Sequence, residues 1–179
     1  PNKDHIEDLD KCLKSLGVKS SYPNIEYIVV ENNSQKEETF AYYQQLETKN
    51  PKAKVVFWEG KGFNYPAINM YGVEYAQGEY LLFLNNDTEI VNEDCIEELL
   101  GYCMRDDVGA AGARLYYEDG SIQHAGVIIG LGGVAAHAFV DTPPEDTGYQ
   151  NRIVMAQDLS AVTAACMMVK RTVFEKVGG

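Results

Sequence analysis

Two short runs of amide and carboxylate side chains each follow an apolar run in the sequence. Glu-Asn-Asn at 31–33 comes directly after residues 25–30, and Asn-Asn-Asp at 85–87 comes directly after residues 80–84. In open α/β sheets, ligands bind beyond the carboxyl ends of the strands. Carboxylates accept hydrogen bonds and amides both donate and accept them, so the first run could bind a nucleobase and ribose. The Asp87 carboxylate could hold Mg²⁺ or Mn²⁺ together with a diphosphate, because these cations take oxygen ligands.

Other polar residues are weaker candidates for chemistry. Each of the two runs could also be an ordinary capped turn between a strand and a helix. His124 follows a predicted hairpin and could contact a substrate, and His137 lies after a Gly-Gly pair, but a lone histidine is more often a structural residue. Arg152 and Lys61 could neutralise a phosphate, although each is more often a solvated surface residue.

Several common sites are excluded by their missing motifs. The stretch 60–62 (Gly-Lys-Gly) lacks the spacing of a phosphate-binding P-loop, and no G-x-G-x-x-G sequence follows a predicted strand. No G-x-S-x-G sequence is present to supply a hydrolase serine. Cys12, Cys95, Cys103 and Cys166 include no C-x-x-C pair, so we expect free thiols rather than a zinc site or disulfides.

The chain is acidic, with a net charge of -12 from 15 Lys and Arg against 27 Asp and Glu. Such a charge repels nucleic acid and anionic lipid at long range, so we expect no nucleic-acid partner. A phosphorylated ligand would need local countercharge from a metal ion, a helix N-terminus or a few cations. We see no window of about 18 apolar residues and no apolar signal segment, and we therefore expect a cytoplasmic chain without a transmembrane segment.

Hydrophobic periodicity predicts alternating helices and strands in the first half of the chain. Residues 4–16 have the spacing of an amphipathic helix, with Asp4 placed to cap it and Gly17 placed to end it. The order of elements, α-β-α-β-α-β-α, favours a parallel sheet with helices on its faces. The further predicted elements are strands at 25–30, 53–58 and 80–84, and helices at 36–49, 66–76 and 92–104.

The second half of the chain has a different character. Asp119-Gly120 is a hairpin signal between two β-rich runs, 108–117 and 122–129. Glycine and proline content predicts irregular loops farther along. The remaining predicted segments are loops at 130–133 and 141–148, a strand at 161–169 and a short helix from Arg171.

Taken together, these segments resemble the family 2 glycosyltransferases, nucleotide-sugar-dependent enzymes of the GT-A fold, and particularly their rhamnosyltransferase-like branch. The resemblance covers nearly the whole chain. It implies an α/β, Rossmann-like GT-A fold with a mostly parallel sheet flanked by helices. It also implies one domain, 1–179, with a nucleotide-binding half at 1–107 and a loop-rich acceptor-side half with a β-hairpin at 108–179. Six segments carry it in the family's order: 1–4 (PNKD), 27–34 (YIVVENNS), 63–69 (FNYPAIN), 78–87 (GEYLLFLNND), 123–126 (QHAG) and 163–169 (TAACMMV).

The resemblance also implies roles for individual residues. The family's D-x-D motif reads Asn-Asn-Asp here, which leaves Asp87 as the one expected ligand of Mg²⁺ or Mn²⁺. The acceptor side would lie near His124 and Ala165. The residues expected around the donor nucleotide are Pro1, Asn2, Glu31, Asn32, Asn64, Asn85, Asn86 and Asp87.

The sequence departs from the family's pattern at both ends. A doubly wound α/β domain should begin with a buried strand, so we expect an apolar strand before Pro1. In the family, the general base is an acidic residue in a segment that follows a Gly-Gly pair, which is Gly178-Gly179 here. We therefore expect the base beyond Gly179. Asp158 is a weaker substitute, because its position before a strand fits a loop better.

The implied function is inverting transfer of a sugar from a nucleotide-diphosphate donor to a glycan or lipid-linked glycan hydroxyl. The implied enzyme is of the hexosyltransferase type and acts in cell-envelope polysaccharide biosynthesis, at the inner face of the membrane. A nucleotidyltransferase of related fold is an alternative, although residues 2–5 do not form the glycine-rich, basic loop of such enzymes. A non-catalytic nucleotide- or glycan-binding module is the other alternative.

Overall fold

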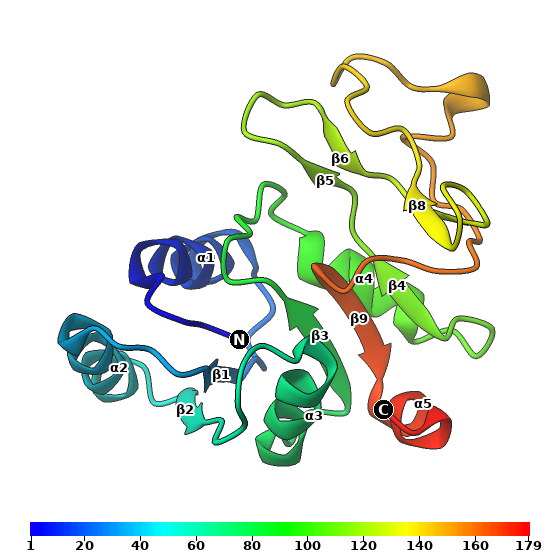
Figure 1. Ribbon diagram of the computed structural model, residues 1–179. Coiled ribbons are helices and arrows are strands. Elements are labelled where there is room, and N and C mark those ends of the chain that lie inside the picture. Colours follow the sequence, from blue (N-terminus) through cyan, green and yellow to red (C-terminus); the bar gives the residue numbers. More distant parts are fainter.

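The computed structural model describes residues 1–179 as helices packed against small β-sheets (Figure 1). The expected α/β class is confirmed, and the order of helices and strands through the first half is the predicted one. The helices are α1 (Ile6–Lys19), α2 (Glu37–Lys49), α3 (Tyr65–Tyr75), α4 (Cys95–Cys103) and α5 (Arg171–Val177), with a 3-10 turn at Tyr149–Asn151. The strands of the first half are β1 (Tyr27–Glu31), β2 (Ala53–Phe57) and β3 (Tyr80–Leu84), and those of the second half are β4 (Ala110–Gly112), β5 (Leu115–Tyr116), β6 (Ile122–His124), β7 (Val127–Ile129), β8 (Ala135–His137) and β9 (Cys166–Lys170).

The strands pair in both directions. β1 and β2 are parallel, from Tyr27 opposite Ala53 to Glu31 opposite Phe57. β9 is antiparallel to β3 and to β4, and it lies between them. Parallel pairing is thus less general than the order of elements led us to expect. The reason is that β9 comes from the far end of the chain and inserts at the edge of β3, which local periodicity does not reveal.

Two hairpins, β5–β6 and β7–β8, lie in the second half of the chain, and Figure 1 shows this part apart from α1, α2 and α3. The predicted turn at Asp119-Gly120 joins β5 to β6, and Gly120 has a φ of 86° that suits glycine. The predicted β-rich run 122–129 is divided into β6 and β7, and the pairing of β7 with β8 was not predicted. Residues 130–133, expected to be an irregular loop, form the turn of this hairpin, where the Gly130 N–H donates to the Val134 carbonyl oxygen over 2.8 Å.

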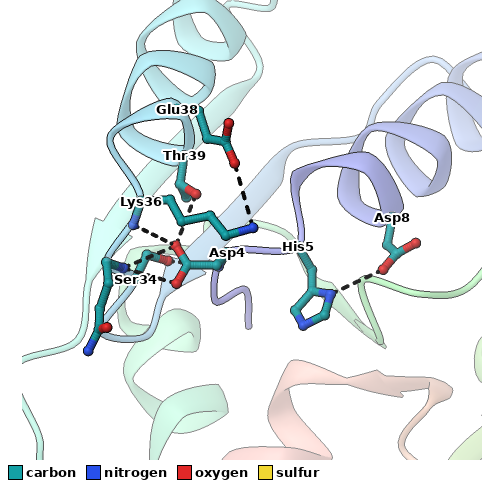
Figure 2. Close-up of polar contacts among 8 residues, drawn as sticks. Asp4, His5, Asp8, Ser34, Lys36, Glu38 and Thr39 are labelled. Atoms are coloured by element: carbon teal, nitrogen blue, oxygen red, sulfur yellow. Dashed lines mark hydrogen bonds and ion pairs between the residues drawn. The ribbon is translucent and has the colours of Figure 1, made fainter.

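The predicted cap of α1 is wrong. Asp4 does not cap this helix, which begins after His5 without a side-chain cap. Asp4 instead has a φ of 57°, and its carboxylate faces the start of α2 (Figure 2). It accepts hydrogen bonds from the backbone N–H groups of Gln35 and Lys36 at 3.0 Å and from the Thr39 hydroxyl at 3.1 Å. Asp4 therefore satisfies free donors at the N-terminus of α2 and fixes that helix to the segment before α1.

Three other predicted boundaries are also wrong. Gly17 does not end α1, which continues to Lys19. α4 begins at Cys95 rather than at residue 92. β9 begins at Cys166, because residues 161–163 have no regular secondary structure and residues 164–165 form a turn.

Three hydrophobic clusters hold the helices to the strands. One face of β1 and β2 packs against α1 and α2 through Val29, Val55 and Tyr43. The opposite face packs against α3, where Val30 and Ile68 are buried together. Successive side chains of a strand point to opposite faces of the sheet. The alternating burial along β1 therefore sets which face each side chain after β1 points toward. The largest cluster joins α1, α4 and β9 through Cys12, Leu16, Ile90, Ile96, Leu99, Cys103, Cys166 and Met168.

A mostly apolar cavity of about 1070 Å³ lies between β1 and β3. Pro1 lines this cavity, and in the next residue the Asn2 N–H donates to the Val30 carbonyl while the Asn32 N–H donates to the Asn2 carbonyl, each over 2.8 Å. These bonds form a parallel bridge between Asn2 and Glu31. The backbone at Asn2 thus extends the β1–β2 sheet toward β3, while the strand expected before Pro1 stays a prediction.

The helices are too short or too polar to cross a bilayer. The four cysteines are free thiols, of which Cys12, Cys103 and Cys166 are buried.

Candidate functional site

A pocket of about 600 Å³ lies at the carboxyl ends of β1 and β3. Its walls come from segments that are far apart in the sequence, and the two polar runs at 31–33 and 85–87 both reach it. Asp87 is the one carboxylate of the lining. The lining residues are Pro1, Asn2, Lys3, His5, Asn32, Asn33, Gly62, Phe63, Tyr65, Asn85, Asn86 and Asp87.

Two of the residues expected at the donor are used by the fold instead. Asn64 caps α3, where its side-chain oxygen accepts a hydrogen bond from the Ala67 N–H over 3.2 Å. Glu31 is buried, and its carboxylate accepts hydrogen bonds from the hydroxyls of Ser34 and Tyr43 at 2.6 and 2.7 Å. Neither side chain lines the pocket. The six other expected residues do line it: Pro1, Asn2, Asn32, Asn85, Asn86 and Asp87.

The side chain of Asp87 is exposed at the pocket. Its charge contributes to the raised pKa values of two neighbouring groups. Burial raises the pKa of the Cys12 thiol to about 11, and the Asp87 charge adds to that shift. Burial also raises the pKa of Tyr65, with a further contribution from Asp87. Asp87 forms no ion pair with a Lys, Arg or His side chain of the fold.

Tyr65 joins the end of β3 to the segment before β9. Its hydroxyl lies 3.2 Å from Asn85 Oδ1 and 3.0 Å from the Ala164 carbonyl oxygen. The Asn85 N–H donates to the Ala165 carbonyl over 2.9 Å. Ala165, expected on the acceptor side, is thus next to the wall of the pocket, and Tyr65 is a site residue that the sequence analysis missed.

Lys3 and His5 were also missed, and both line the pocket as exposed side chains. The His5 ring lies on α1's side of the pocket, with Nδ1 at 3.4 Å from a carboxylate oxygen of Asp8 (Figure 2). Lys61, Arg152 and the alternative base Asp158 do not line the pocket. Lys3 is therefore the one side-chain ammonium available to a phosphorylated ligand there. Its position beside the expected Pro1 and Asn2 was the signal that could have identified it.

His124 lies away from the pocket with 1% of its surface exposed. Its ring packs edge-on against His137, with ring centroids 4.7 Å apart. Burial, together with His137, lowers the pKa of His124 to about 4, so the imidazole is neutral near pH 7. Its expected acceptor-side role has no exposed surface to support it and rests on the resemblance alone.

The residues of the pocket fit a divalent cation only in part. No group of three or more His, Cys, Asp and Glu side chains comes together in a way that could hold a metal. The pocket offers the Asp87 carboxylate and the amide oxygens of Asn85 and Asn86. Mg²⁺ and Mn²⁺ often take one or two carboxylates and complete their shell with phosphate oxygens and water. The donor set therefore suits a cation shared with a diphosphate rather than a cation held by protein alone.

The family model of glycosyl transferase family 2 matches residues 1–178. The chain therefore belongs to glycosyl transferase family 2. Its α/β fold matches that of a solved GT-A glycosyltransferase, the mannosyltransferase PcManGT from Pyrobaculum calidifontis in complex with GDP-Man and Mn²⁺. The TM-score is 0.65 at 13% sequence identity, and the match covers 100% of this chain and 45% of that chain.

Two longer proteins are similar to the chain along its whole length. The chain is 41% identical over 179 residues to the uncharacterized protein y4gI of Sinorhizobium fredii. It is 39% identical over 181 residues to the O-antigen biosynthesis protein RfbC of Myxococcus xanthus. The chain spans 20% of the length of the first protein and 14% of the second, so each relative contains much that this chain does not.

Proposed function

We propose that this chain is the donor-binding part of an inverting glycosyltransferase. The enzyme moves a sugar from a nucleotide diphosphate to a hydroxyl of a glycan or lipid-linked glycan. Membership of family 2 gives the transferase class. The observation that carries the proposal is the pocket in which the residues after β1 and β3 meet, with Asp87 as its one carboxylate.

Each wall of the pocket supplies a different part of donor recognition. The Asn32 and Asn33 amides suit a base and ribose, since they both donate and accept hydrogen bonds. Asp87, with the amide oxygens of Asn85 and Asn86, would hold Mg²⁺ or Mn²⁺ beside the diphosphate. When bound, such a cation would neutralise the charge that develops on the leaving diphosphate. Lys3, from the N-terminal segment of the lining, would supply a second positive charge.

The transfer also needs a general base. The acceptor oxygen forms a bond to the anomeric carbon while the bond from that carbon to the diphosphate oxygen breaks, and the acceptor proton passes to the base. Asp87 faces the cation in this scheme and cannot serve both roles. The base therefore remains a prediction for chain beyond Gly179.

The finer assignments follow from the resemblance and the relatives. We place the enzyme in the rhamnosyltransferase-like, hexosyl-transferring branch. The similarity to an O-antigen biosynthesis protein supports a role in cell-envelope polysaccharide synthesis. The acceptor would then be a lipid-linked glycan met at the cytoplasmic face of the membrane.

The test is donor turnover by the full-length protein. UDP-, GDP- and dTDP-sugars are supplied with Mn²⁺, and release of the nucleoside diphosphate is measured. We expect release from one donor class, and we expect Asp87→Ala to reduce it at least about 100-fold, since metal assistance is worth several kcal/mol. Asp106→Ala, which removes an exposed carboxylate outside the pocket, is the matched control.

Two further measurements separate the alternatives. Consumption of a nucleoside triphosphate and a sugar phosphate, supplied in place of the nucleotide sugar, would identify a nucleotidyltransferase. Donor binding without any turnover would identify a binding module. Equal turnover by wild type and Asp87→Ala would contradict the role of Asp87.

A further inference from the structure

A chain of buried hydrogen bonds leads from the pocket into the interior through α2. Asn86, which lines the pocket, donates through Nδ2 to Asn2 Oδ1 over 2.8 Å. Asn2 donates through Nδ2 to the Tyr43 hydroxyl, also over 2.8 Å. Tyr43 donates to Glu31 Oε2 over 2.7 Å. Asn2, Tyr43 and Glu31 are each at most 3% exposed, so we call these four side chains the buried relay.

The Glu31 carboxylate determines which group donates and which group accepts at the inner end of the buried relay. It can only accept hydrogen bonds while ionised, and it also accepts from the hydroxyl and the backbone N–H of Ser34. Leaving a buried carboxylate short of a donor is costly, so the Tyr43 proton points to Glu31. Burial raises the pKa of Tyr43, and the phenol therefore keeps that proton.

The direction then passes outward to the pocket. Because Tyr43 has one proton and gives it to Glu31, its oxygen must accept from Asn2, which places the Asn2 NH₂ group toward Tyr43. Asn2 thus presents its carbonyl oxygen to Asn86, and Asn86 must present its NH₂ group to Asn2. The carbonyl oxygen of Asn86 therefore points away from Asn2 and is free to accept from a ligand.

We propose that Tyr43 is a positioning residue, which acts through Asn2 to hold the Asn86 amide with its carbonyl oxygen available to the bound donor. This inference rests on the proposed function. A carbonyl oxygen accepts from a hydroxyl or binds a cation, whereas a reversed amide would present an NH₂ group that repels a cation. The buried relay thus sets which chemistry the pocket offers at Asn86.

The first test is made on the protein without ligand. Tyr43→Phe removes the hydroxyl, and Tyr42→Phe is the matched control on the same helix, because the Tyr42 hydroxyl donates instead to Asp10 at 3.3 Å. The side-chain ¹H–¹⁵N amide resonances of Asn86 report its orientation and hydrogen bonding. We expect Tyr43→Phe to shift them and to speed their exchange with water, while Tyr42→Phe leaves them unchanged. Unchanged Asn86 resonances in Tyr43→Phe would overturn the proposal.

The second test is a double-mutant cycle on nucleotide affinity, with UDP, GDP and dTDP as probes in the presence of Mn²⁺. We expect Tyr43→Phe to weaken binding about fivefold, the size of one lost neutral hydrogen bond. In an Asn86→Ala background, Tyr43→Phe should have no further effect, because the side chain that it positions is gone. Equal weakening in both backgrounds would show a general structural role and would overturn the proposal.

Glu31→Gln tests the same idea with less disturbance of packing. It keeps the shape of the side chain but removes the charge that fixes the direction, so Tyr43 is free to donate to Asn2 instead. We expect the same Asn86-dependent loss of affinity as for Tyr43→Phe, and full wild-type affinity would count against the relay. If wild-type protein binds none of the three nucleotides, the proposed function fails, and the Asn86 resonances still decide the relay by themselves.

Discussion

At the scale of single residues, His124 shows how burial changes the chemistry of a side chain. Its imidazole is buried against His137, and its pKa is lowered to about 4 by burial and then by that neighbour. In the unfolded chain the pKa of histidine is about 6.5. Between these two values the unfolded chain binds the additional proton. The folded state therefore loses stability as the pH falls from about 6.5 toward 4.

We expect this residue to remove about 2 kcal/mol from the free energy of unfolding between pH 7.5 and pH 5.0. Urea unfolding at the two pH values measures the loss. The matched variant is His124→Gln, which has no proton to bind at that position, and its loss between the two pH values should be smaller by the same amount. An identical loss in both proteins would show that His124 is not held neutral.

The sequence predicted which polar residues lie at the ends of the strands. It did not predict which of them line the pocket and which are hydrogen-bonded inside the fold. Asp87 and the neighbouring amides reach the pocket because any side chain at the end of a buried strand faces that edge of the sheet. Glu31 also lies at the end of a strand, but its carboxylate accepts a hydrogen bond from Tyr43 on the next helix and does not line the pocket. Such a pairing depends on tertiary packing of α2, which no local pattern encodes.

At the scale of elements, the packing of α3 on β1 depends on Gly72. A Cβ atom at this position would lie 2.8 Å from Val30 Cγ2, closer than real contacts allow. Gly101 in α4 offers the opposite case, because a Cβ atom there would meet nothing within 4 Å. Both glycines lie inside helices, so alanine gains helix propensity at each.

We expect the same substitution to have opposite signs at the two glycines. Gly72→Ala should destabilise the protein by about 1–3 kcal/mol, because the strain of overpacking outweighs the gain in helix propensity. Gly101→Ala should stabilise it by up to about 1 kcal/mol. Denaturant unfolding of the two variants measures both effects. If Gly72→Ala were as stabilising as Gly101→Ala, α3 would not lie as close to β1 as the structure has it.

Elements with strong local periodicity were predictable, and elements that depend on distant partners were not. The first three strands and the helices between them each show their own apolar pattern, and they lie within a few residues of the predicted bounds. The place of β9 between β3 and β4 follows from pairing across the chain. Residues 127–129 lie within the predicted β-rich run 122–129, but β8 was missed because Ala-Ala-His at 135–137 has no strand pattern of its own.

At the scale of the whole molecule, the net negative charge opposes the binding of an anionic donor in the pocket. A charge of -12 repels a diphosphate at long range. Under the proposed function this repulsion would be offset locally, because Lys3 and Asp87 both line the pocket, and Lys3 would supply an ammonium and Asp87 a ligand for a divalent cation. Donor binding should therefore depend on the cation far more strongly than it would in a basic protein.

We propose that Asp87 holds a divalent cation against the donor diphosphate. Calorimetric titration of wild-type protein with UDP, GDP and dTDP, in Mn²⁺ and in EDTA, tests it most directly, with Asp87→Ala measured alongside. We expect Mn²⁺ to tighten the binding of one nucleotide to wild type by at least about tenfold, or about 1.4 kcal/mol, and to leave Asp87→Ala unaffected. Equal affinity with and without Mn²⁺ in wild type, or an equal gain in Asp87→Ala, would contradict the account.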